Sequence, residues 1–154
     1  MADHVLETRF WLARPRPDVF AFFADPANLV RVSPPALGVR VLTPGVKLAA
    51  GAVVDLRVRW LGIPLRWRMY VRESDPPYRF VDVQVRGPWA RWEHRHRFLD
   101  EGGGTWIEDR VTYRLPLGPL GVALHRAFVE RQLRAAWAFR QARVTELLMG
   151  AARE

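Results

Sequence analysis

An alternating pattern between residues 91 and 114 constrains the fold more than any other feature of the sequence. The first half of this stretch has large side chains at every second position and arginine or glutamate between them. The large side chains are Trp92, His94, His96 and Phe98. A period of two is typical of a β-strand with one face toward the core and one toward solvent. The segment Asp100–Gly104 then predicts a hairpin turn into a second strand.

Polar groups share the apolar faces of both predicted strands. Asp109 and Tyr113 lie on the same face as Ile107 and Val111, and the two histidines of the first strand lie among its aromatic residues. A buried polar group without a partner costs roughly 2–7 kcal/mol. These four polar groups therefore either satisfy one another or line a cavity.

The pairing between the two strands decides which histidine meets the carboxylate. Pairing of Phe98 with Thr105 places His94 beside Asp109. A shift of two residues places His96 there instead. Both alternatives predict a carboxylate–imidazole pair on the inner face of the sheet.

The rest of the chain predicts an α+β fold. Strand alternation, proline positions and turn residues give the order strand, two short helices, six strands and one long helix. The expected elements are strands near 5–13, 37–42, 54–60, 65–72 and 78–86, helices near 17–23 and 26–32, and a last helix from about 119 to 149. A curved antiparallel sheet with an apolar inner face needs a cover, and the last helix is the element large enough to provide it. We expect residues 1–154 to form one domain.

Composition excludes several classes of protein. The chain of 154 residues has no cysteine, so disulfides and thiolate chemistry are excluded. No apolar run reaches the roughly 18 residues of a membrane span, and the first residues lack the pattern of a secretory signal. The expected location is therefore the cytoplasm. The net charge is +8, and arginine supplies nearly all of the positive charge because Lys47 is the only lysine.

One further stretch connects the chain to a known superfamily. Gly87-Pro88-Trp89 precedes the first strand of the hairpin, Gly103-Gly104-Thr105 lies in its turn, and Leu115-Pro116 with Gly118 follows it. With Gln84 and the alternating residues already named, this pattern resembles small bacterial ligand-binding proteins of the START-like, or SRPBCC, superfamily. The resemblance implies a helix-grip fold with a cavity between the sheet and the last helix. The superfamily includes lipid carriers, coenzyme Q-binding proteins, polyketide cyclases and hormone receptors, and it has no common catalytic motif.

The predicted ligand site combines the inner faces of the strands with the last helix. Its expected residues are Trp60, Trp67, Met69, Trp92, His94, His96, Phe98, Asp109, Tyr113, Phe128 and Phe139. We expect its mouth at 33–38 and 116–120. His94, His96 and Asp109 are the candidates for an acid–base role, although no catalytic assignment follows from the sequence. A metal bound by these three residues is the less favoured alternative because further ligands are scarce, so no metal and no cofactor is expected.

The outer face of the predicted sheet is rich in arginine. Its expected cations are Arg57, Arg59, Arg66, Arg68, Arg72, Arg91, Arg95, Arg97, Arg110 and Arg114; its expected carboxylates are Asp55, Asp82, Glu93 and Glu108; its expected aromatic residues are Trp89, Trp106, Tyr70 and Phe80. Interspersed charges favour cross-strand ion pairs over a specific nucleic-acid site. Transient contact with an anionic membrane surface is the other use of such a face.

Three functions remain open at this point. The leading hypothesis is the binding of a hydrophobic or amphipathic small molecule, such as a lipid, isoprenoid or polyketide, by a carrier or sensor. The second is a cyclase or hydrolase-like enzyme that uses His94 or His96 with Asp109. The third is a surface-binding module that acts through the arginine face. The sequence does not indicate an oligomeric state.

Overall fold

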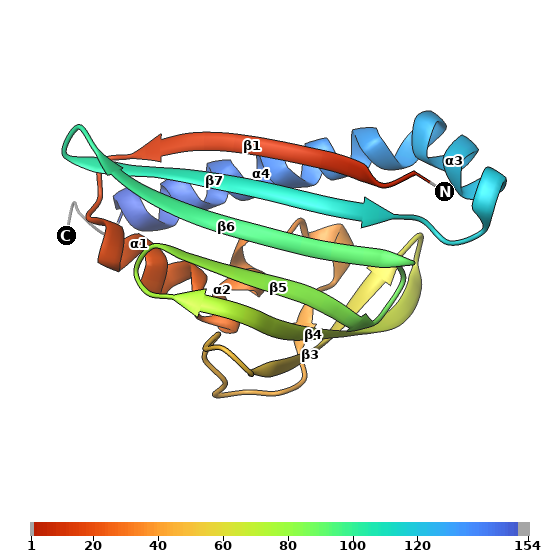
Figure 1. Ribbon diagram of the computed structural model, residues 1–154, viewed down its shortest axis with the longest axis horizontal. Coiled ribbons are helices and arrows are strands. Elements are labelled where there is room, and N and C mark those ends of the chain that lie inside the picture. Colours follow the sequence, from red (N-terminus) through yellow and green to blue (C-terminus); the bar gives the residue numbers. More distant parts are fainter. Residues whose placement is uncertain (1, 151–154) are drawn as a thin grey trace.

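A seven-stranded antiparallel sheet wraps over a long C-terminal helix (Figure 1). The computed structural model describes residues 2–150. The strands are β1 (His4–Leu12), β2 (Arg40–Val41), β3 (Val53–Trp60), β4 (Ile63–Asp75), β5 (Arg79–Arg86), β6 (Arg91–Glu101) and β7 (Gly104–Arg114). Their order across the sheet is β1-β7-β6-β5-β4-β3-β2. The first and last long strands in sequence therefore lie side by side at one edge.

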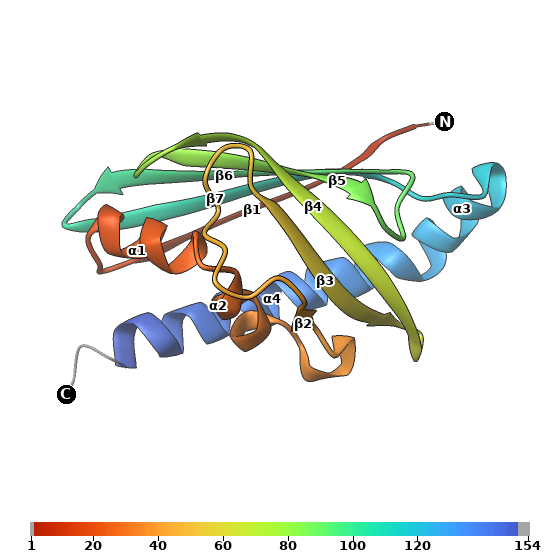
Figure 2. The ribbon, with the colours of Figure 1, turned by 90° about the horizontal axis from the view of Figure 1, so that it is seen from below.

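The helices lie on the concave side of the sheet (Figure 2). After β1 come α1 (Arg16–Phe23), α2 (Pro26–Val32) and a 3₁₀ turn at Pro35–Leu37. The Asp25 side chain caps α2 by accepting a hydrogen bond from the backbone N–H of Ala27. The C-terminal helix consists of α3 (Gly118–Leu124), one π-helical turn (His125–Val129) and α4 (Glu130–Gly150). No helix among the described residues is long and apolar enough to cross a membrane.

The predicted order of elements is confirmed, with two local corrections. The strand expected at 37–42 is reduced to Arg40–Val41, because Pro35–Leu37 forms the 3₁₀ turn and Gly38 takes a left-handed conformation. The hairpin between β6 and β7 has a loop of only two residues, Gly102 and Gly103, both with positive φ. Glycine adopts that conformation without strain, so the two strands continue to the loop.

The apolar residues form two clusters that divide the space between sheet and helix. One cluster includes Trp89, Trp92 and Trp137 near the middle of α4. The other includes Phe80 and Phe98 near the C-terminal end of α4. Register irregularities of β4 against β5, between Arg68 and Met69 and between Val71 and Glu73, accompany the curvature of the sheet.

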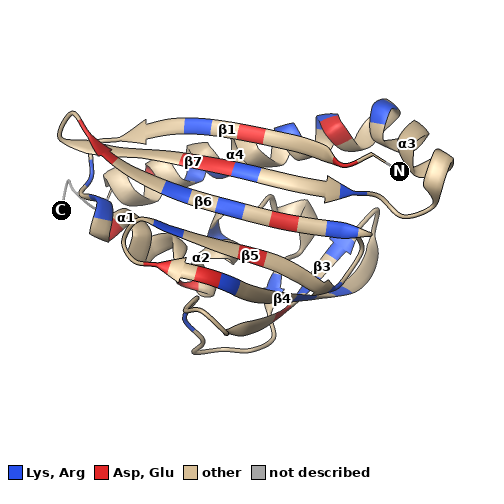
Figure 3. Cartoon of the chain, in the orientation of Figure 1, with Lys and Arg blue, Asp and Glu red and all other residues tan. Residues whose placement is uncertain are grey.

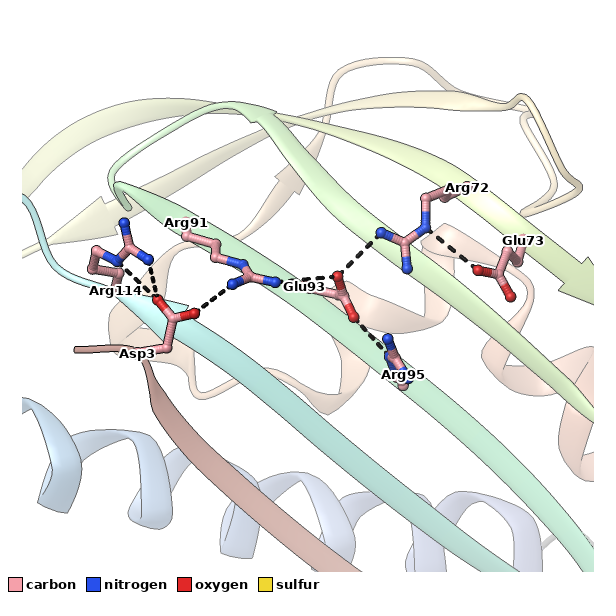
Figure 4. A network of polar contacts seen from close by, with 7 residues as sticks. All are labelled: Asp3, Arg72, Glu73, Arg91, Glu93, Arg95 and Arg114. Atoms are coloured by element: carbon pink, nitrogen blue, oxygen red, sulfur yellow. Dashed lines mark hydrogen bonds and ion pairs between the residues drawn. The ribbon is translucent and has the colours of Figure 1, made fainter. Parts of the chain in front are cut away.

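The outer face carries ion pairs across the strands, as the sequence predicts. Glu93, only 7% exposed, lies among Arg72, Arg91 and Arg95 (Figure 4). Asp3 extends this network by accepting hydrogen bonds from Arg91 and Arg114. The prediction was wrong for Asp82, Phe80 and Trp89, which do not belong to the outer face. Phe80 stacks on His96, Trp89 packs against Trp92, and the Asp82 carboxylate accepts a hydrogen bond on the inner side.

We predict that Gly104→Ala destabilises the fold by about 1–3 kcal/mol. A Cβ atom at this position would lie 2.2 Å from the Leu12 carbonyl oxygen and 2.5 Å from a ring carbon of Trp11, and backbone on one side leaves little room to relax. Thermal or urea unfolding measures the effect. Gly150→Ala is the control, since nothing lies within 4 Å of a Cβ there, and it is expected to leave stability unchanged. Equal stability of the two variants would contradict the prediction.

Candidate functional site

A cavity of about 670 Å³ lies between the concave face of the sheet and α4. This volume falls within the usual range for small-molecule sites. Strands β3 to β6 supply one wall, α4 supplies the opposite wall, and α1, α2 and the segment after α2 close the side. Most of the lining is apolar, with a few polar side chains that include Asp82, His94, His96 and Arg140.

Tryptophans cover the part of the cavity nearest the β3–β4 hairpin. Trp60 meets Trp89 edge to face at 5.0 Å between ring centroids, and Trp67 meets Trp92 in the same way at 5.1 Å. Such edge-to-face contacts fix the orientation of large rings. This end of the cavity therefore has a rigid aromatic wall.

The opposite part of the wall carries a buried chain of carboxylates and imidazoles. Asp109 Oδ1 lies 2.8 Å from His94 Nε2 and 3.1 Å from His96 Nδ1. The second contact is an ion-pair distance without hydrogen-bond alignment, because His96 Nδ1 lacks an aligned partner among the described residues. On its other side, His96 Nε2 lies 3.0 Å from Asp82 Oδ2. The four side chains thus form the sequence Asp82, His96, Asp109, His94 through space.

Strand register explains why these side chains meet. His96 is opposite Asp109 in the β6–β7 pair, and His94 is opposite Asp82 in the β5–β6 pair. The register with Phe98 opposite Thr105 was wrong, since the structure pairs Phe98 with Ile107, and the shifted alternative is confirmed. The two imidazole centroids are 3.6 Å apart, so His94 also reaches Asp109 from the neighbouring position.

Burial and the two carboxylates, Asp82 and Asp109, determine the pKa shifts within this group of four buried side chains. Burial and the neighbouring His96 lower the pKa of His94, and its hydrogen bond to Asp109 does not outweigh them. For His96 burial also favours the neutral form, but Asp109 and Asp82 together raise its pKa. Burial works against ionisation of Asp109 as well, yet contacts with both imidazoles hold its pKa well below the usual range. His96 therefore keeps its proton more readily than His94, which faces the cavity in its neutral form at neutral pH.

Seven of the predicted site residues line the cavity. They are Trp60, Trp67, Met69, Trp92, His94, His96 and Phe139. Of the predicted mouth, Ser33, Pro34, Ala36 and Leu37 also belong to the lining, whereas residues 116–120 do not.

Four predicted residues lie outside the cavity wall, and each is held elsewhere. Phe98 packs with Phe20 and Phe23 in the second core cluster, and Asp109 lies behind the histidines. The Tyr113 hydroxyl is 2.7 Å from His125 Nε2 at the π-helical turn, and Phe128 packs against the first core cluster. The sheet twists along β6 and β7, so side chains on one face of a strand do not all reach the same space.

The sequence analysis did not assign several polar side chains to the wall, including Asp82 and Arg59, which it placed on the outer face, and Arg140. Asp82 was expected on the outer face, whereas its carboxylate lies in the cavity wall, 3.0 Å from His96 Nε2. Arg140 is not among the predicted site residues, yet it lines the cavity. Its guanidinium lies over the rings of Phe23 and Trp137, 5.3 and 5.7 Å from their centroids.

A family model described as polyketide cyclase / dehydrase and lipid transport matches residues 12–140. The chain belongs to this family. A search of curated proteins finds no match to the sequence.

Solved structures share the fold of this family member at low sequence identity. The protein TTHA0849 from Thermus thermophilus is 22% identical with a TM-score of 0.72, over 96% of this chain and 99% of that one. The ZhuI aromatase/cyclase from Streptomyces sp. R1128 is 18% identical with a TM-score of 0.69, over 95% and 96%. A norcoclaurine synthase point mutant from Thalictrum, solved with a transition-state analogue, is 14% identical with a TM-score of 0.70, over 98% and 97%. These similarities confirm the predicted helix-grip fold, and the match to the family model confirms the START-like resemblance.

Three residues of this cyclase-family chain have the composition of a metal site. Ligand atoms of Asp82, His94 and His96 lie within 4.8 Å of one another. The sequence analysis had considered Asp109 as the carboxylate ligand, whereas the structure places Asp82 in that role. The fit is poor, because the Nε2 atoms of the two imidazoles already meet two different carboxylates, Asp109 and Asp82. The hydrogen-bonded chain accounts for these residues without an ion.

We predict that Asp109→Ala destabilises the protein by about 1–3 kcal/mol at neutral pH, because it removes the acceptor of a buried imidazole. The lowered pKa of Asp109 means that its contribution is present above the unfolded carboxyl pKa of about 3.9 and is lost as the pH falls through the lower folded value. Urea unfolding at several pH values should therefore show the wild type and the variant converging in acid. A difference in stability that stays constant down to acid pH would contradict the assignment.

Proposed function

We propose that this protein binds a hydrophobic or amphipathic small molecule, of the lipid, isoprenoid or polyketide class, in the cavity between the sheet and α4. The observation that supports this function is a largely apolar cavity of about 670 Å³ whose wall includes a few polar side chains, among them His94, His96 and Arg140. Membership of the polyketide cyclase / dehydrase and lipid transport family points in the same direction. The volume suits a ligand of drug size or a folded acyl chain.

The distribution of side chains favours a ligand with one polar end. Trp60, Trp67 and Trp92 suit a ring system or an apolar chain, because aromatic surfaces bind other apolar surfaces well. Arg140 forms no ion pair with a carboxylate among residues 2–150, although its side chain lies in the cavity wall. A hydroxyl, carbonyl or carboxylate of the ligand near Arg140 and His94 would supply the missing partner.

We predict that apolar ligands stabilise the protein in proportion to their affinity. A ligand that binds only the folded state contributes about 2.7 kcal/mol at 100 times its dissociation constant. Thermal-shift measurements with fatty acids, isoprenoid alcohols, sterols and aromatic polyketides test the proposal, and native mass spectrometry identifies any ligand that copurifies. The absence of both a copurified ligand and a thermal shift with every class would refute it.

A matched pair of variants localises the binding. Ala136 lines the cavity from α4, so Ala136→Phe should fill the space and reduce ligand affinity by at least about tenfold. Ala138 is exposed on the same helix, and Ala138→Phe should leave affinity unchanged. Isothermal titration with the best ligand of the screen measures both variants. Equal affinity in the two variants would place the ligand outside this cavity.

A second candidate function is catalysis on a bound polyketide-like substrate. The chain Asp82, His96, Asp109 and His94 favours it, because a neutral imidazole at the cavity wall with a carboxylate behind it has the composition of a general base. The similarity in fold to the ZhuI aromatase/cyclase is compatible with this candidate. His94→Asn would then abolish conversion of a linear poly-β-ketone chain while leaving its binding within a few-fold. Loss of binding together with conversion would instead assign His94 to ligand binding.

A further inference from the structure

The loop between β3 and β4 contains an unfavourable residue for its geometry. Trp60 pairs with Ile63, so the loop consists of Leu61 and Gly62, with φ angles of 50° and 80°. Two-residue loops of this kind favour Asn-Gly or Gly-Gly, and the β6–β7 hairpin uses two glycines at the same positions. Leucine in a left-handed conformation is strained. Its side chain gains no core contact in return, because Leu61 is 70% exposed.

Exposed apolar side chains gather at this end of the molecule. Ile63 is 61% exposed beside Leu61, and Leu117, at the start of α3, is 66% exposed. Within residues 2–150, Leu61 and Leu117 are the two non-glycine residues with positive φ. Both views of the ribbon place the β3–β4 loop and α3 at the same end (Figures 1 and 2). Two strained and exposed leucines at one end indicate a surface that meets an apolar partner.

The outer face of the strands that lead to this loop carries an excess of positive charge. Arg40 is opposite Arg57, and Arg57 is opposite Arg66, so like charges align across β2, β3 and β4. Next to these arginines, Asp55 pairs with Arg66 and Arg68. We call Arg40, Arg57, Arg66, Arg68 and Arg86 the arginine patch. Like charges placed directly opposite one another destabilise a sheet, so the fold itself does not explain this patch.

The other half of the outer face, formed by β1, β6 and β7, has no such excess of positive charge. On β1, β6 and β7 each arginine that faces outward has a carboxylate partner, such as Glu108 for Arg97 and Glu7 for Arg110. Figure 3 shows blue and red segments mixed on these strands. Within residues 2–150, the patch members Arg40, Arg57 and Arg86 pair with no carboxylate, whereas Arg66 and Arg68 share Asp55. The excess of positive charge therefore lies on β2 to β5, next to the apolar loop.

We propose that the β3–β4 loop and the arginine patch dock the protein onto an anionic phospholipid bilayer. Arginines interact with the anionic headgroups, while Leu61 and Ile63 enter the boundary with the acyl chains. Trp60, Leu61 and Gly62 line the cavity, so docking brings one end of the cavity to the membrane surface. The use of this docking, the exchange of an apolar ligand with the bilayer, rests on the proposed function. Docking itself requires no ligand.

Vesicle sedimentation with the ligand-free full chain tests the proposal. Vesicles of phosphatidylglycerol and phosphatidylcholine in equal parts should bind the protein, and vesicles of phosphatidylcholine alone should bind it much more weakly. The affinity should fall with increasing salt, because the headgroup interactions are screened. Equal binding to both kinds of vesicle, or none to either, would overturn the proposal.

Charge variants distinguish the arginine patch from net charge. Arg57→Gln with Arg66→Gln should lower the affinity for anionic vesicles about 25-fold, which corresponds to about fivefold for each arginine. Arg97→Gln with Arg110→Gln removes the same charge from the other half of the face and should change the affinity little. Neither pair lines the cavity, so ligand thermal shifts measured without vesicles should persist in both. Equal losses in the two double variants would contradict a localised docking surface.

A variant of the β3–β4 loop separates membrane binding from a role in stability, because it is expected to weaken the first while it improves the second. Leu61→Asn should raise the melting temperature, because asparagine tolerates the left-handed conformation, and should weaken vesicle binding about tenfold. Tyr78→Thr removes an exposed aromatic residue from the β4–β5 turn at the opposite end and should leave vesicle binding unchanged. Unchanged vesicle binding in Leu61→Asn would overturn the insertion of the loop. Tight binding of duplex DNA at physiological salt, lost in Arg57→Gln with Arg66→Gln, would assign the patch to nucleic acid and overturn the membrane proposal.

Discussion

Asp109 is the buried charge around which the inner face of the sheet is ordered. It is 3% exposed and contacts imidazoles from two positions of β6, while Asp82 on β5 meets His96 from the other side. A slip of β6 by two residues against β7 would keep every side chain on its face, but it would move His96 away from Asp109 and place either Phe98 or His94 opposite that carboxylate. Because breaking a buried ion pair costs about 3–5 kcal/mol, these contacts fix the register of three strands. The same contacts give the cavity its polar wall.

The cavity itself follows from a mismatch between a curved sheet and the side chains of α4. Trp137 and Val144 anchor the helix in the two core clusters, but Ala135 and Ala136 are too small to fill the space opposite the strands. Trp67 and Trp89 leave their indole N–H groups buried without partners among the described residues. Protein interiors are otherwise packed to high density. A ligand in this space would restore contacts that the chain alone does not make.

Local sequence patterns predicted most of the fold. The residues of the site also depend on strand pairing and sheet twist, which local patterns do not contain. The alternation around His94 and His96 and the prolines that open the helices identified the elements, because each depends on near neighbours in sequence. The face of Asp82 was mispredicted since the valines of β5 are split between buried and exposed positions, which only the neighbouring strands decide. Sheet twist separated Phe98 and Tyr113 from the cavity. Twist cannot be predicted from the alternation of inward and outward residues along a strand.

The π-helical turn at His125–Val129 has a consequence for the end of the molecule that carries α3. A π turn is equivalent to one extra residue inside an α-helix, and each residue of an α-helix advances the face by about 100°. The turn therefore separates the phase of α3 from that of α4. Leu120 and Leu124 are 58% and 43% exposed, while the stripe of α4 that includes Val144 is buried. Deletion of one residue from this turn would rotate both leucines about the helix axis. The outward direction of the apolar side chains of α3 therefore depends on a single residue.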